Sequence, residues 1–195
     1  MKTSNYILIA IFILFIACIL TFFLTAKQQN DSHADKTEIM LPDTINVIVA
    51  ESNTNVIVNG SDKNSLLWNN TIKGTAIYHI SADTLFLNVK ANFRPVVLLN
   101  HSVSIFGEKD NALDINNYKA NRLTVKKTGG NLMLARNTID TLQIQAIDNA
   151  TVYLFDNIQI KYLSANMKNG STFNYTQNNK IEKMSIESDN QINGH

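Results

Sequence analysis

Cysteine, proline and glycine are scarce in this sequence of 195 residues, which contains one cysteine, two prolines and seven glycines. The single cysteine, Cys18, excludes an intramolecular disulfide, so packing and hydrogen bonds must stabilise the fold. So few glycines and prolines exclude a collagen-like chain and a flexible low-complexity linker. The length leaves room for one sizeable domain with a hydrophobic core.

An excess of one charge is also absent. The sequence has 17 Lys and Arg against 16 Asp and Glu, which gives a formal net charge of +1, and no block of like charges occurs. Proteins that bind nucleic acid or an anionic membrane surface show a basic patch or stripe. The charge distribution therefore argues against a nucleic-acid partner.

Motifs for catalysis and metal binding are missing as well. The sequence has no Gly-x-Ser-x-Gly elbow, no cysteine–histidine arrangement, no glycine-rich phosphate loop and no metal-type spacing of cysteines and histidines. His33 lies between Asp31 and Asp35, but no second nitrogen or sulfur ligand is near, so we interpret it as a solvated linker histidine. We therefore expect no catalytic, cofactor-binding or metal site.

One long hydrophobic run is present at residues 6–26. It contains no charge, and a helix of its 21 residues spans roughly the 30 Å of bilayer hydrocarbon. The apolar region of a cleaved signal peptide is shorter, about 7–15 residues. The run therefore predicts an uncleaved signal anchor, with residues 1–5 in the cytoplasm. The polar residues 27–42 predict a tether, and we expect the following domain on the periplasmic or surface side of the membrane.

Cys18 leaves a second interpretation of the N-terminus open. Ile16-Ala17-Cys18 resembles the end of a bacterial lipoprotein signal, in which the cysteine is acylated after cleavage. Residues 19–24 remain hydrophobic, however, whereas a lipoprotein normally becomes polar at this point. We therefore prefer a packed membrane cysteine without chemistry.

A repeating apolar pattern organises residues 103–186, where pairs of the form apolar-x-apolar return about every ten residues. The middle residue is usually polar, and this alternation buries one face of a short strand and exposes the other. The pairs are Val103-x-Ile105, Leu113-x-Ile115, Leu123-x-Val125, Leu132-x-Leu134, Leu142-x-Ile144, Val152-x-Leu154, Leu163-x-Ala165, Phe173-x-Tyr175 and Met184-x-Ile186. We expect Leu123, Leu142, Leu163 and Met184 to form one inward column.

The turns between the pairs repeat with twice this period. Asn and Gly enter the left-handed backbone region at least cost, which a tight bend between short strands requires. One predicted turn ladder consists of Asn117, Asn137, Asn157 and Asn178, and the opposite one of Asn111, Gly130, Asn149, Gly170 and Asn190. Two pairs and two bends in roughly 20 residues describe one coil of a β-solenoid. The sequence thus predicts an all-β, single-stranded parallel β-helix over residues 43–192.

The tandem units within this region resemble the bacterial head GIN domain family, whose members are described as heads of autotransporter adhesins. The units are RLTVKKTGGNLML (122–134), TLQIQAIDNATVYL (141–154) and YLSANMKNGSTFNY (162–175), preceded by Ile45-x-Val47 and Val56-x-Val58. The resemblance covers residues 43–192, although family members have more Gly-Ser turns. It implies a right-handed parallel β-helix outside the cytoplasm of Gram-negative bacteria, and it implies no reaction.

An enzyme remains the alternative, because parallel β-helices also carry polysaccharide lyases and hydrolases. Such chemistry needs clustered carboxylates, for which the candidates are Asp140, Asp148 and Asp156. Asp148 and Asp156 fall at or beside predicted turns, where Asp is common for local backbone bonding. Their spacing within a coil of roughly 20 residues places them on different sides of the solenoid.

The outward residues are mostly Ser, Thr, Gln and Asn, with Tyr118, Tyr153 and Tyr162 expected among them. A polar sheet with occasional aromatic rings can hold a glycan by hydrogen bonding and ring stacking, or hold an envelope protein. We therefore predict a non-catalytic, adhesin-like binding or scaffold module at the cell envelope, without a cofactor.

Overall fold

The computed structural model describes residues 36–69, 78–89, 94–155, 157–189 and 192–194. The chain divides into two compact units, residues 1–36 and 37–195, and the described residues lie almost entirely in the second. The predicted anchor at residues 6–26, most of the predicted tether, Asp156 and Asn190 lie outside the described residues. Within the described part of the chain, no helix is long and apolar enough to cross a membrane.

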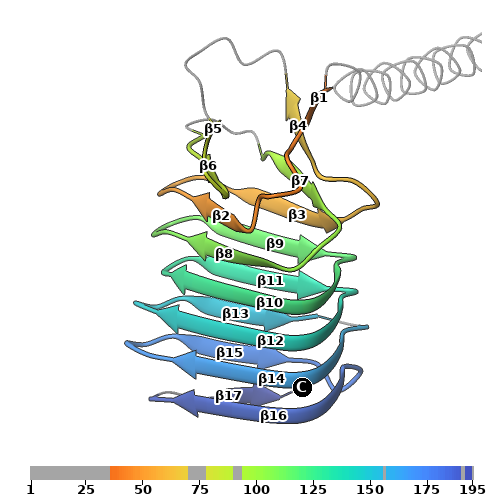
Figure 1. The fold of residues 1–195 in the computed structure, drawn as a ribbon. Coiled ribbons are helices and arrows are strands. Elements are labelled where there is room, and N and C mark those ends of the chain that lie inside the picture. The colour runs from red at the N-terminus through yellow and green to blue at the C-terminus, as the bar shows by residue number, and fades with distance from the viewer. Residues whose placement is uncertain (1–35, 70–77, 90–93, 156, 190–191, 195) are drawn as a thin grey trace, which may run out of the picture. The chain divides into compact units, whose positions relative to one another are not determined.

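The described residues of the second unit form two sheets that face each other (Figure 1). The nine-stranded sheet contains, in spatial order, β1 (Lys36–Met40), β4 (Ser65–Asn69), β7 (Val96–Leu99), β3 (Val56–Gly60), β9 (Ala112–Asn116), β11 (Asn131–Ala135), β13 (Thr151–Leu154), β15 (Thr172–Tyr175) and β17 (Ile192–Gly194). The eight-stranded sheet contains β16 (Lys180–Ser188), β14 (Gln159–Met167), β12 (Thr138–Ile147), β10 (Lys119–Thr128), β8 (Val103–Gly107), β2 (Val47–Ala50), β6 (Thr84–Leu87) and β5 (Tyr78–Ser81). From β8 onward, consecutive strands alternate between the sheets, so the all-β solenoid predicted from the sequence is confirmed.

The core lies between the two sheets, and its columns have the predicted register. Leu123 pairs with Leu142, Leu142 with Leu163, and Leu163 with Met184, all in parallel strands. The three leucines are buried, whereas Met184 in the outermost strand is 44% exposed. Alternate residues of each strand point outward, so the apolar-x-apolar pattern of the sequence is the burial pattern of the strands.

The long strands of the eight-stranded sheet turn a corner near their beginning. In β12 the buried Ile139 is followed by two consecutive outward residues, Asp140 and Thr141, before the buried Leu142. The alternation therefore slips by one residue, which a flat strand does not allow. The residues before the corner thus form a short third side of the coil, and the residues after it lie in the eight-stranded sheet.

The layers at the N-terminal end do not follow the order of the chain. Strand β2 lies between β6 and β8, and β3 lies between β7 and β9, so the first coil is enclosed by layers that come later in the sequence (Figure 1). The strands on the two sides of this coil are therefore not joined in the order of the layers. Residues 100–102 instead connect β7 on one side of the first coil to β8 on its other side. We call this connection the crossover link.

Antiparallel strands cover the N-terminal end of the stack. Strand β4 runs antiparallel to β7, and β5 forms a hairpin with β6. The ring of Trp68 packs against Tyr78 with centroids 6.5 Å apart. These strands cover the last layer at this end, whose edge would otherwise be open to pairing with another chain.

Candidate functional site

The turn that precedes the corner differs from the predicted asparagine ladder by one position. The pairing of Lys119, Thr138, Gln159 and Lys180 aligns Asn117, Arg136, Asn157 and Asn178 in one column. Asn117, Arg136 and Asn157 have positive φ angles of 51°, 56° and 64°. Asn137 belongs to the next column, because a shorter coil separates it from Asn117. The asparagines are evenly spaced in the sequence, so their spacing did not reveal that the coil from Lys119 to Thr138 has only 19 residues.

Asn137 is buried, and its side chain forms hydrogen bonds with the backbone of the neighbouring coil. Its Oδ1 accepts a hydrogen bond of 2.8 Å from the backbone N–H of Tyr118, and its Nδ2 donates one of 2.9 Å to the carbonyl of Ile115. Asn179 makes the equivalent bonds two coils later, to Ile158 N–H and the Leu154 carbonyl. These side chains therefore satisfy turn groups that would otherwise be buried without partners.

The opposite turn contains the predicted Gly130, Asn149 and Gly170, all with positive φ. A Cβ atom on Gly130 would come within 2.3 Å of the Asn111 carbonyl oxygen, and one on Gly170 within 2.3 Å of Asn149 Oδ1. Both positions therefore require glycine, for conformation and for space. Counted from the preceding strands, Gly130, Asn149 and Gly170 share one position, and the turn after Gly130 is one residue shorter than the other two.

The three predicted surface tyrosines have different environments. Tyr118 is fully buried, which corrects the expectation that it faces solvent, because its ring fills the inward side of the turn beside Asn137. Its hydroxyl donates to the His101 carbonyl, and burial raises its pKa. Tyr153 is partly buried and stacks on Phe155 at 5.7 Å, whereas Tyr162 is 50% exposed beneath the ammonium of Lys183.

The described acidic candidates for catalysis are not brought together. Asp140 lies at the corner of β12 and pairs with Lys161 at 2.6 Å. This hydrogen bond and the charge of Asp140 raise the pKa of Lys161. Asp148 lies in the turn after β12 and accepts a 2.9 Å hydrogen bond from Asn169. Eight residues of extended chain separate Asp140 from Asp148, on the order of 25 Å.

Two adjoining hollows lie along the crossover link, with volumes of about 630 Å³ and 550 Å³. They share Asn100 and Lys119, so we treat them as one surface and call it the crossover groove. Its lining residues are Gly60, Ser61, Asp62, Leu99, Asn100, His101, Ser102, Asn117, Lys119, Ala120, Asn121, Thr138 and Asp140. The groove follows from the topology, because the link must pass the edge of the enclosed coil to reach β8.

Hydrogen bonds fix the crossover link in place. Asn100 N–H donates to Asn64 Oδ1 at 3.1 Å, and its Nδ2 donates to the Asp62 carbonyl at 3.3 Å. One ring nitrogen of His101 lies 2.9 Å from Asn100 Oδ1, and the other contacts the Ile45 carbonyl. The groove wall is therefore held by bonds to the loop after β3 and to the residue Ile45 before β2, which makes it a preformed surface.

The chemistry of the groove is mainly that of uncharged hydrogen-bonding groups. Asn117 and Asn121 are exposed and carry amides that donate and accept, and Ser61 and Thr138 add hydroxyls. Lys119 is an exposed cation, whereas Asp140 is already paired with a lysine outside the groove. In the described ranges no group of three or more His, Cys, Asp or Glu could hold a metal ion.

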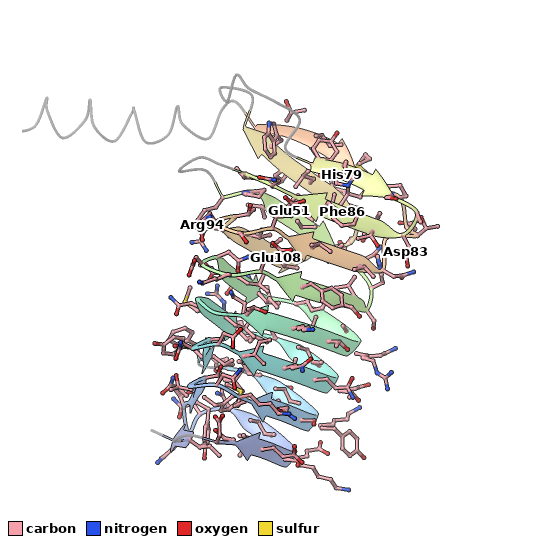
Figure 2. All side chains as sticks on the ribbon, turned by 90° about the vertical axis from the view of Figure 1, so that its left-hand side faces the viewer. Glu51, His79, Asp83, Phe86, Arg94 and Glu108 are labelled. Carbon is pink, nitrogen blue, oxygen red and sulfur yellow. The ribbon has the colours of Figure 1, made fainter. Side chains whose placement is uncertain are left out.

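A second surface lies on the outer face of the eight-stranded sheet and contains aromatic rings (Figure 2). His79 stacks on Phe86 with centroids 4.4 Å apart and planes at 3°. Val49 pairs with both Phe86 and Phe106, and Phe106 is 37% exposed. Glu51 and Glu108 lie next to this stripe, where Asn88 and Ser52 donate hydrogen bonds to them. The sequence analysis missed this surface because its residues come from three distant segments, 49–52, 79–88 and 106–108.

Comparisons with known proteins give one similarity. No protein-family model matches the chain, and no curated protein matches it. The crystal structure of a "putative adhesin" from Bacteroides fragilis is similar with a TM-score of 0.37 and 12% sequence identity. The similarity covers 82% of this chain and 96% of that chain. Membership of the head GIN domain family therefore stays a prediction from the sequence.

Proposed function

We propose that this chain is a non-catalytic, adhesin-like binding module of the cell envelope, and that the crossover groove holds a neutral glycan. One observation carries the proposal: two adjoining polar hollows meet at Asn100 and Lys119 on a rigid solenoid. Each has a volume within the range of roughly 300–1,000 Å³ that is typical of small-molecule sites. An open groove of this size accommodates a short run of sugar rings.

The side chains favour a neutral, polyhydroxylated ligand over a charged one. Sugar hydroxyls both donate and accept, and so do the amides and hydroxyls that line most of the groove. Lys119 and Asp62 line the same hollow with opposite charges, so neither charge dominates the surface. The pairing of Asp140 with Lys161 supports binding rather than acid–base chemistry, because an ammonium already engages this carboxylate.

The groove is tested with Lys119→Ala and Asn121→Ala in the full chain, purified in detergent and applied to immobilised envelope and host glycans. Each variant is expected to bind the retained glycan about fivefold to tenfold more weakly, because each removes about one hydrogen bond. Lys180→Ala is the matched control, because Lys180 has the same coil position as Lys119 three layers away. It is expected to bind like the unaltered protein.

Two results would overturn this assignment. Equal loss of binding in Lys119→Ala and Lys180→Ala would place the ligand outside the groove. Shortened or unsaturated glycan products that disappear in Asp140→Asn or Asp148→Asn would instead establish a polysaccharide hydrolase or lyase. Asp156→Asn belongs in the same series, because it completes the set of acidic residues named from the sequence.

We further propose that residues 6–26 form an uncleaved anchor that keeps the domain outside the cytoplasm, and that the coils wind in the right-handed sense usual for parallel crossovers. Protease added to cells with a permeabilised outer membrane is expected to degrade the domain while the N-terminal segment stays in the membrane fraction. A soluble periplasmic product that begins after Ala26 would contradict the anchor. Fatty-acid labelling that disappears in Cys18→Ala would favour the lipoprotein alternative.

A further inference from the structure

The C-terminal end of the solenoid differs from its covered N-terminal end. Strands β16 and β17 are the outermost strands of the two sheets, so no described strand pairs with their outer edges. At the opposite end, β4 and β5 run antiparallel to their neighbours β7 and β6. The last regular coil therefore presents two strand edges of the kind that pairs readily with another strand.

Apolar core positions are also exposed at this end. Met184 is 44% exposed and Ile192 is 45% exposed, whereas their partners one coil earlier, Leu163 and Phe173, are buried. The side chains keep the inward direction of their columns, and among the described strands no following layer contacts them. An added layer would bury both side chains and pair both strand edges, so this end is suited to an interface.

The sequence of β16 indicates which partner fits. Five consecutive residues of β16, Lys183-Met184-Ser185-Ile186-Glu187, are in order a cation, an apolar residue, a serine, an apolar residue and an anion. If two copies pair antiparallel about a two-fold axis at Ser185, Lys183 of each copy faces Glu187 of the other. Met184 then faces Ile186 in the interior. A parallel copy in register would place lysine against lysine and glutamate against glutamate, which is unfavourable.

We propose that the C-terminal end of the solenoid is a homodimer interface, in which β16 pairs antiparallel with β16 of a second copy. A two-fold axis perpendicular to the eight-stranded sheet keeps inward side chains inward, so the two cores become continuous. The same operation brings β17 opposite β17 of the second copy. The contact is isologous and closes after two chains, which prevents fibre growth from this edge.

Lys183 and Glu187, the charged residues at the two ends of this five-residue segment, have weak contacts within one copy. The Lys183 ammonium lies 5.3 Å from the centroid of the Tyr162 ring, and the Glu187 carboxylate accepts a hydrogen bond of 3.3 Å from Asn166. Both side chains are exposed. Each can therefore turn to an opposite charge across the two-fold axis, and the dimer gains two such pairs.

The register is tested by cysteine cross-linking in the full chain carrying Cys18→Ser. Ser185→Cys places a thiol opposite its own copy across the two-fold axis, within the Cα separation that a disulfide allows. Mild oxidation is expected to double the mass on a non-reducing gel. Ser164→Cys is the matched control, because Ser164 pairs with Ser185 one coil earlier and points to the same outer face. It is expected to remain monomeric on the gel.

A charge series tests the same interface without a new covalent bond. Lys183→Glu alone and Glu187→Lys alone are each expected to weaken dimerisation about tenfold, since each places like charges opposite in two symmetric positions. The double variant Lys183→Glu/Glu187→Lys is expected to restore the dimer. Sedimentation of the full chain in detergent measures the dissociation constant, and circular dichroism shows that each variant remains folded.

Three outcomes would overturn the proposal. They are equal cross-linking of Ser185→Cys and Ser164→Cys, a monomeric protein at all measurable concentrations, and a double variant no better than the single variants. The first would indicate random collision, the second a partner other than a second copy, and the third a different register. Unaltered dimerisation in Lys119→Ala separates this interface from the glycan groove.

Discussion

Ile144→Asp is expected to unfold the solenoid, whereas Gln143→Asp, one position away, is expected to leave it folded. Ile144 is buried in the central strand β12 and pairs with Val125 and Ala165 on either side. A carboxylate there would be buried without a partner in a core of aliphatic side chains. The cost exceeds about 4 kcal/mol, a large part of the roughly 5–15 kcal/mol that stabilises a typical domain.

The two variants form a matched pair, because they introduce the same charge into the same strand. Gln143 is exposed, so aspartate at this position remains solvated and is expected to change the free energy of unfolding by less than about 0.5 kcal/mol. Urea unfolding followed by circular dichroism measures both effects. Similar stability of the two variants would mean that the register of β12 is wrong.

Lys127→Ala is expected to cost about 3–5 kcal/mol, the second largest effect, although lysine is ordinarily a surface residue. Lys127 is fully buried, and its ammonium donates to the carbonyl oxygens of Glu108, Thr128 and Gly129. Alanine would leave a cavity and remove a donor from three carbonyls. Lys127→Met keeps most of the volume and is expected to cost about 1–3 kcal/mol.

The stability supplied by Lys127 also depends on pH. Burial lowers the pKa of Lys127 from 10.5 to about 8, and the charge of Asp110 opposes this shift. Between these two values the unfolded chain binds more protons at this amine than the folded protein does. The free energy of unfolding therefore rises with pH in this window, by at most about 3 kcal/mol, since the three carbonyls favour the charged form.

Urea midpoints of the unaltered protein and of Lys127→Met, measured at about pH 7 and about pH 9.5, separate this effect from other titrating groups. The unaltered protein is expected to gain stability relative to Lys127→Met as pH rises. A parallel change in the two proteins would show that the amine has an ordinary pKa in the folded state. Comparison of Lys127→Ala with Lys127→Met measures the part of the stability loss that comes from the missing side-chain volume.

The regular coils could be predicted from the sequence because their signals are local. Alternation within each strand identifies Leu123 and Leu142 as buried, and the strands that carry them pair as the period of the repeat requires. Tyr118 was misplaced because alternation stops at a turn, where one residue points inward without an apolar neighbour two positions away. Asn137 was misplaced because coils of unequal length shift the column by one residue.

The enclosed first coil and the crossover groove could not be predicted in the same way. Strands β2 and β3 have the same alternation as other strands, and nothing local shows that their neighbours on one side are β6 and β7. The groove is a product of that long-range order. One signal was available in Asn100-His101-Ser102, a polar link without the turn residues of the regular coils, but its partners are distant in the sequence.

The enclosed position of β2 and β3 determines how the domain resists mechanical force. If residues 6–26 anchor the domain, as we propose, tension passes through β1 and then reaches the residues that lead into β2. If the first coil lay at the end of the stack, tension would peel its strands away one hydrogen bond at a time. Because each strand is paired on both edges, the pull must break two ladders together. The outer strands β1 and β4 can detach first. The doubly paired strands β2 and β3 then resist further unfolding.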